Sequence, residues 1–236
     1  MFDAKRLLDQ FLGSQGQQHG RPGGGDFLSD LTRRSGGGSL ASGALAGGLA
    51  SVLLGSKSGR KLGSSAVKMG GMALVAGLAY RAYTDWQAKQ SGQALPQAQT
   101  PDLSPPPQGS VFLPSGKAED DRARLLVSAM IAAAKADGFI DADEQKRIFN
   151  KVGTLDLDSD DKAFLMDQLR APLDLDGLVR SASGPEVGAE IYAASLLAID
   201  PDHPAEKAYL QMLAARLGLA GGLVEEIHRK ADMALE

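Results

Sequence analysis

The sequence has no cysteine, which excludes a disulfide framework, a thiolate metal site and a cysteine nucleophile. Its three histidines lie in neither the His-Glu-x-x-His nor the Ser-His-Asp pattern of hydrolases. The basic residues are scattered and the net charge is −4, so the chain lacks the concentrated basic surface with which proteins bind nucleic acids. These absences predict a protein that is not an enzyme and does not bind nucleic acid.

Glycine and proline, with 29 and 11 residues, are spread unevenly and divide the chain into segments. Residues 1–12 have apolar side chains at helical spacing and predict an amphipathic helix, which would lie on a membrane or pack on the chain's own domain. Residues 13–38 predict a flexible Gly-rich linker. Residues 87–116 contain six prolines and predict an extended Pro/Gln-rich linker.

Residues 39–86 form a Gly/Ala-rich hydrophobic region, and no charge occurs from Ser35 to Ser56. Small side chains recur there at every fourth residue, a spacing that lets two membrane helices approach closely: Ser39, Gly43, Gly47, Ser51 and Gly55. A second apolar stretch, from Leu62 to Tyr80, continues the pattern with Ala73 and Gly77. It ends in aromatic residues typical of a membrane interface, namely Tyr80, Tyr83 and Trp86.

This region predicts a membrane helix or a helical hairpin, and its small-residue face favours a homo-oligomer. The alternative is a soluble or surface-lying hairpin, because many alanines and glycines dilute the hydrophobicity. After residue 117 no strand pattern appears, and helical signals predict one bundle of about seven helices over residues 117–236. Among them are helices at about 118–136, 159–169, 175–181 and 223–235, and helices that start at Pro185 and Pro204. The fold class is therefore all-α.

An acidic corner follows the first of these helices and begins at Asp137-Gly138. A standard EF-hand loop ending at Glu144 would need oxygen ligands where Ala133 and Lys135 stand, so that loop is excluded. One interpretation is a turn and a helix cap, with Asp141 as the N-cap. The other is an oxygen-rich site for Ca²⁺, Mg²⁺, Mn²⁺ or Zn²⁺ on Asp137, Asp141 and Glu144, extended by Asp143, Asp200 and Glu206.

A looser copy of this corner, Ile199-Asp200 followed by Glu206, lies about 60 residues further on and predicts an internal pseudo-repeat. It has Pro201 and Pro204 where the first corner has Gly138 and Asp141, which disfavours a symmetric two-cluster site.

Four features of the chain together resemble the YebE-like bacterial inner-membrane proteins, a family of unknown function whose C-terminal part is similar to the tellurite-resistance TerB fold. They are residues 1–8, the Gly/Ala-rich apolar middle, residues 134–144 and residues 209–219. The resemblance implies a TerB-like helical domain over residues 117–236, divalent-metal binding at the acidic corner, and a role in stress response near the membrane. It also favours the cytoplasmic side for that domain.

The leading hypothesis is a non-enzymatic module, anchored in the bacterial inner membrane, that binds other proteins or senses a metal. Two alternatives stay open: a metal-dependent enzyme that uses the acidic corner, and an oligomeric membrane scaffold built on the small-residue face.

Overall fold

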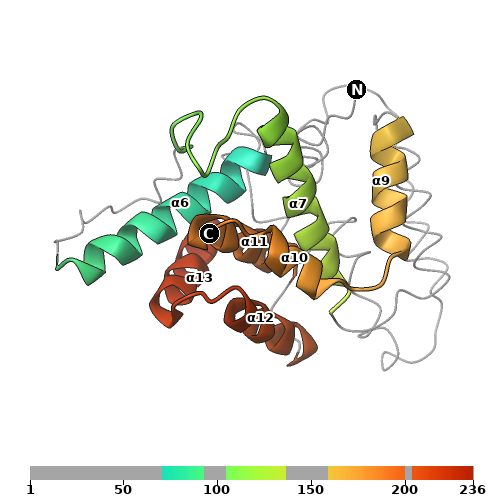
Figure 1. Ribbon diagram of the computed structural model, residues 1–236. Helices are drawn as coiled ribbons and strands as arrows, with labels where there is room; N and C mark the ends of the chain where they lie inside the picture. The colour runs from blue at the N-terminus through green and yellow to red at the C-terminus, as the bar shows by residue number, and fades with distance from the viewer. Residues whose placement is uncertain (1–70, 93–104, 137–158, 200–203, 236) are drawn as a thin grey trace, which may run out of the picture.

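The computed structural model describes residues 71–92, 105–136, 159–199 and 204–235 of the chain. These residues form seven helices and no strand, so the predicted all-α fold is confirmed for them. Figure 1 shows the order: α6 (Gly71–Gln90), α7 (Lys117–Ala134), α9 (Ser159–Arg170), α10 (Leu175–Ser181), α11 (Pro185–Ala198), α12 (Pro204–Arg216) and α13 (Gly221–Leu235).

The bundle is organised around α11, which packs against α6, α7, α12 and α13. Gly184 precedes the helix, and Pro185 occupies its first turn, where the missing N–H costs nothing. Every residue from Val187 to Ile199 is buried. A helix that is apolar on all sides is stable only when neighbours surround it, and α11 is therefore the centre of the core.

Small side chains let α7 approach α11 closely. Alanines account for many of the buried residues of both helices, and Ser195 Oγ lies 3.4 Å from the carbonyl oxygen of Ala129. Glu119 and Asp120 lie in the first turn of α7, where negative charge interacts favourably with the helix dipole. The two Ala-rich helices that precede the two acidic corners of the predicted pseudo-repeat are thus packed against each other.

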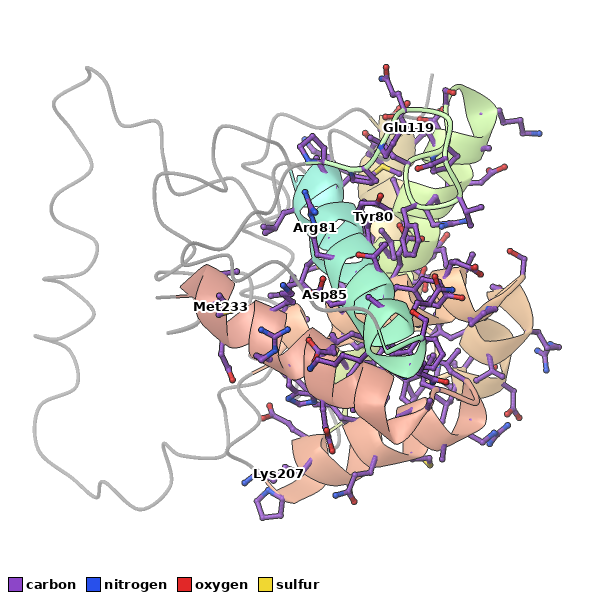
Figure 2. All side chains as sticks on the ribbon, turned by 90° about the vertical axis from the view of Figure 1, so that its left-hand side faces the viewer. Tyr80, Arg81, Asp85, Glu119, Lys207 and Met233 are labelled. Atoms are coloured by element: carbon purple, nitrogen blue, oxygen red, sulfur yellow. The ribbon has the colours of Figure 1, made fainter. Side chains whose placement is uncertain are left out.

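The most N-terminal described helix, α6, belongs to this core. Its residues from Met72 to Ala79 are almost all buried, and it packs against α11 and α13. In Figure 2, α6 lies across the bundle with Asp85 toward α13. The sequence assigned residues 71–86 to a membrane region, whereas the structure places them in the helical bundle with the C-terminal helices.

The segment 105–116 also packs on the bundle, although the sequence assigned it to an extended linker. Gly109 adopts a positive φ of 79° and its N–H donates to the carbonyl of Leu113, at 2.7 Å. This turn directs Phe112, which is 5% exposed, against Tyr80 and Tyr83, with ring centroids 5.5 and 5.8 Å apart. The packed unit therefore begins well before residue 117.

The turn between α12 and α13 has a local cause. Gly218, at φ 66°, follows α12, and the N–H groups of Gly218 and Leu219 donate to the carbonyls of Ala215 and Ala214. This is the Schellman pattern, in which glycine takes the left-handed conformation that ends a helix. It returns the chain so that α13 packs against α11 and α6.

Candidate functional site

The predicted metal site lies almost wholly outside the described residues. Asp137, Asp141, Asp143, Glu144 and Asp200 are all in that position. Glu206 is described, in the first turn of α12, where it is half-buried. Over the described ranges, no group of three or more histidine, aspartate or glutamate side chains could hold a metal ion. The divalent-metal site stays a prediction.

The predicted membrane and oligomer residues are divided in the same way. Ser39, Gly43, Gly47, Ser51 and Gly55 lie outside the described residues. Ala73 is half-buried and Gly77 is buried in α6.

The predicted interface belt consists of Tyr80, Tyr83 and Trp86, and its aromatic side chains pack on protein. Tyr80 and Tyr83 contact Phe112, and a Cβ added to Gly222 of α13 would lie 3.4 Å from the indole of Trp86. Within the part of the chain that the structure describes, no helix is both long and apolar enough to cross a membrane.

The end of α7 carries a lysine that caps a second helix. The Nζ atom of Lys135 donates to the carbonyl oxygens of Gln168 and Ala171, both at 2.6 Å. These carbonyls lie at the C-terminus of α9, where a cation is favourable to the helix dipole. Burial lowers the pKa of Lys135 from its ordinary value. Lys135 therefore ties α9 to α7 immediately before the acidic corner begins.

An open groove of about 300 Å³ lies beside this contact, between α7, α10 and the α9–α10 connection. We call it the Lys135 groove. Its lining combines apolar and polar side chains, among them Leu125, Ile131, Pro172, Leu173, Leu178, Ser128, Ser181 and Lys135. Asp174 also lines the groove, and its carboxylate accepts a hydrogen bond from the N–H of Gly177 at 2.7 Å. Asp174 is thereby the N-cap of α10. Leu173 is 41% exposed, so the groove has an apolar residue open to solvent.

A buried contact between an arginine and a glutamate joins α7 to α11. Arg122 donates to Glu190, which is fully buried, and also to the carbonyl of Val111 at 3.1 Å. Burial raises the pKa of Glu190 to about 8, and Arg122 acts in the opposite direction. Glu190 Oε1 has no hydrogen-bond partner among the described residues. A carboxyl group with a pKa near neutrality is often catalytic. The carboxyl group of Glu190 is instead enclosed by protein, and its Oε2 accepts a hydrogen bond from Arg122.

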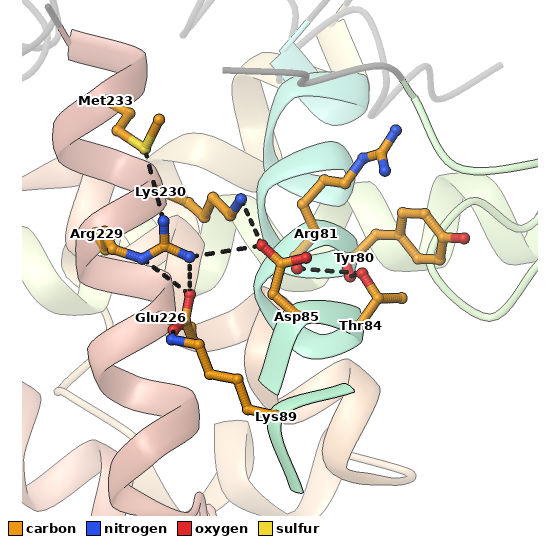
Figure 3. Close-up of polar contacts among 9 residues, drawn as sticks. All are labelled: Tyr80, Arg81, Thr84, Asp85, Lys89, Glu226, Arg229, Lys230 and Met233. Carbon is orange, nitrogen blue, oxygen red and sulfur yellow. Dashed lines mark hydrogen bonds and ion pairs between the residues drawn. The ribbon is translucent and has the colours of Figure 1, made fainter. Parts of the chain in front are cut away.

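Charged side chains also join α6 to α13 (Figure 3). Lys230 Nζ lies 2.6 Å from Asp85 Oδ2, and Arg229 lies 3.5 Å from the same oxygen. Glu226 pairs with Lys89 of α6 and with Arg229. Burial raises the pKa of Glu226, but Lys89 and Arg229 together have the larger effect and the pKa is lowered. Glu226 therefore stays ionised near neutral pH, and the network holds α13 on α6.

A tyrosine and a histidine form the polar contact between α11 and α13. The hydroxyl of Tyr192 lies 2.8 Å from Nε2 of His228. Burial raises the pKa of Tyr192 to about 12 and lowers the pKa of His228, on which Asp232 acts in the opposite direction. The sequence alone predicts no role for Tyr192, His228, Glu190 or Arg122. One signal was available, because Glu190 is the single charge in the run from Val187 to Ile199.

These contacts define a class: an all-helical bundle whose buried ionisable side chains join its helices to one another. The chain belongs to the DUF533 family, a family of proteins of unknown function, whose model matches residues 39–231. That range includes α6, in agreement with its place in the core.

A relative from Yersinia enterocolitica, described as "Uncharacterized protein in ampR 5'region", is 29% identical over 115 residues. The alignment covers 47% of this chain and 83% of the relative. No solved structure matches the chain. The resemblance to YebE-like proteins and to the TerB fold stays a prediction.

Proposed function

We propose that this protein is a membrane-anchored, non-enzymatic module that binds another protein through the Lys135 groove. The observation that carries the proposal is the groove itself. It is open, it combines apolar walls with hydroxyl groups and one ammonium group, and an exposed leucine lies at its edge. A volume of about 300 Å³ is at the lower end for small-molecule pockets and suits the insertion of side chains from a partner.

The non-enzymatic part of the proposal is supported by the state of Glu190. Glu190 is a described carboxyl group with a pKa of about 8, and a pKa near neutral pH suits a general acid or base in catalysis. Its side chain is nevertheless fully buried between α7 and α11 and paired with Arg122, and it does not line the groove. A buried contact of this kind between an arginine and a carboxyl group serves helix packing.

The membrane part of the proposal rests on the sequence from residue 39 to residue 70. Since residues 72–83 of α6 contribute to the core, the uncharged stretch from Ser35 to Ser56 becomes the main candidate for contact with lipid. Fractionation of bacteria tests it with the full chain and a variant that lacks residues 39–70. We expect the full chain with the membranes and the variant in the soluble fraction. Recovery of the full chain without detergent would contradict the anchor.

Photo-crosslinking tests the groove. A photoreactive amino acid is placed at Leu173, at the groove, or at Met212, which is exposed to a similar extent on α12. We expect an adduct of one discrete mass from position 173 only. Ser128→Trp should fill the groove and remove that adduct, whereas Met212→Trp should leave it unchanged.

Melting curves of both tryptophan variants show whether they remain folded. The binding proposal fails if position 212 reacts equally, or if a folded Ser128→Trp variant still gives the adduct.

A further inference from the structure

The polar residues of α13 lie on two sides of one apolar stripe. Leu223, Ile227 and Ala231 recur at helical spacing and are all buried. At 100° per residue, Glu226 and Lys230 lie on one flank of this stripe and His228 on the other. The first flank faces α6, through Asp85 and Lys89. The second faces α11, through Tyr192.

The contact on the second flank is short and enclosed. The Tyr192 hydroxyl and His228 Nε2 are 2.8 Å apart, the two rings pack with centroids separated by 5.8 Å, and Tyr192 is only 2% exposed. Buried hydroxyl groups need a hydrogen-bond partner. Nε2 of a neutral imidazole can accept a hydrogen bond from the hydroxyl group. An imidazolium carries a proton on both nitrogens and can only donate hydrogen bonds.

The charged groups around His228 can be assigned element by element. On α13, Asp232 acts on it from one turn away, and Glu226, Arg229 and Lys230 lie toward α6. On α11, Glu190 pairs with Arg122 of α7. On α12, the pKa of Tyr209 is raised to about 12 by burial, so this residue stays neutral. Asp232 is thus the one described charge that offsets a proton on His228.

Acidification from pH 7 to pH 5 changes few of these groups. Glu190, with a pKa of about 8, is already mostly protonated at pH 7, and Glu226, with a lowered pKa, remains ionised. Burial holds the pKa of His228 below its ordinary value of 6.5. A histidine whose pKa is lowered in the folded state contributes stability that is fully present above pH 6.5. This contribution is lost as the pH falls through the folded pKa.

We propose that the His228–Tyr192 contact is a pH-sensitive clasp, and that a proton on His228 loosens α13 from α11. The proton places a charge in a half-buried position and makes Nε2 a hydrogen-bond donor, so that the Tyr192 hydroxyl can only accept from it. Glu226, whose pKa is lowered, keeps its pairs with Lys89 and Arg229, and these hold that flank of α13 on α6. The structural change is therefore local to the α11–α13 contact.

Hydrogen exchange of the full chain at pH 7, 6 and 5, corrected for intrinsic rates, tests the clasp. We expect protection of α13 to fall relative to α7, by about tenfold for each unit of pKa by which His228 lies below 6.5. His228→Gln keeps a hydrogen-bonding group that does not titrate, and its α13 protection relative to α7 should be independent of pH. Asp232→Asn should enlarge the loss at pH 5.

The same pH dependence in His228→Gln as in the unmodified chain would overturn the proposal. If that variant does not fold, the other two of the three histidines, His19 and His203, are replaced by glutamine instead. The ring of His228 is then the single imidazole signal in the NMR spectrum. Its titration midpoint should coincide with the midpoint of α13 exchange, and separate midpoints would equally refute the clasp.

Discussion

Replacing Glu190 by glutamine should make the stability of the protein much less dependent on pH. The carboxyl is fully buried, and burial raises its pKa from 4.5 to about 8 despite the adjacent Arg122. A raised folded pKa favours the protonated form. The stability that this group provides is fully present below about pH 4.5 and is lost as the pH rises through about 8.

The magnitude follows from the two pKa values. At about 1.4 kcal/mol for each unit of pKa, a rise from 4.5 to about 8 corresponds to a loss of about 5 kcal/mol at high pH. Between pH 5 and pH 8 the expected loss is about 3 to 4 kcal/mol. That is a large part of the ~5–15 kcal/mol by which a domain is stable. Glutamine has nearly the same shape as protonated glutamate, can still accept from Arg122 and does not titrate.

Urea denaturation at pH 5, 6, 7 and 8 measures this difference. At pH 5 the Glu190→Gln variant and the unmodified chain should have similar free energies of unfolding. At pH 8 the variant should be more stable, by about 3 to 4 kcal/mol. Glu225→Gln, at an exposed position on α13, is the control and should change stability little at any pH. If the free energies of unfolding of Glu190→Gln and of the unmodified chain differ by the same amount at every pH, the reasoning is refuted. Arg122 would then keep Glu190 ionised from pH 5 to pH 8.

Three further substitutions test single contacts. Lys135→Met keeps the aliphatic chain but removes the donor to the carbonyl groups of Gln168 and Ala171, so it should lower the free energy of unfolding by about 1–3 kcal/mol. The control, Lys117→Met at the exposed start of α7, should leave the free energy of unfolding unchanged. Phe112→Ala should cost about 3–5 kcal/mol in the same assay, and a cost near zero would mean that segment 105–116 is not packed on α6. A double-mutant cycle of Asp85→Asn and Lys230→Met should give a coupling of about 0.5–1 kcal/mol that decreases in 1 M NaCl; a coupling unaffected by salt would argue against an ion pair.

Local signals in the sequence predict most helix boundaries well. The structure places helices at Ser159–Arg170 and Leu175–Ser181, within one residue of the predicted ranges. Pro185 and Pro204 begin α11 and α12 as predicted, because proline is favourable in a first helical turn. These features depend on neighbouring residues alone, so they can be read without the tertiary structure.

The position of α6 could not be predicted in this way. The first half of α6, from Met72 to Ala79, has glycine, alanine and large apolar residues on all sides, and such a segment suits a lipid environment and a protein core equally well. What distinguishes the two is the partner, and the partners of α6 are α11 and α13, more than 90 residues away in the sequence. The aromatic residues at its end were predicted to meet headgroups, and they instead meet Phe112 and the backbone of Gly222.

The polar contacts were equally hidden, because their partners are far apart in the chain. Arg122 and Glu190 are 68 residues apart, and Lys89 and Glu226 are 137 apart. No spacing rule connects such residues. Composition did offer one indication, since a lone glutamate in the apolar run from Val187 to Ile199 must find a cation or remain protonated. That argument predicts a partner for Glu190 but not which arginine or lysine it is.

The polar side chains of α11 explain how so apolar a helix is held in one orientation. A helix that is apolar on all sides gains nearly the same burial at any rotation about its axis. Glu190, Tyr192 and Ser195 differ in direction by 100° per residue, and they meet Arg122 on α7, His228 on α13 and a carbonyl on α7. Rotation of α11 would leave buried polar groups unpaired, at a cost of ~1–3 kcal/mol each. We infer that these contacts set the orientation of α11, and that protonation of His228 weakens one of them while the contacts to α7 remain.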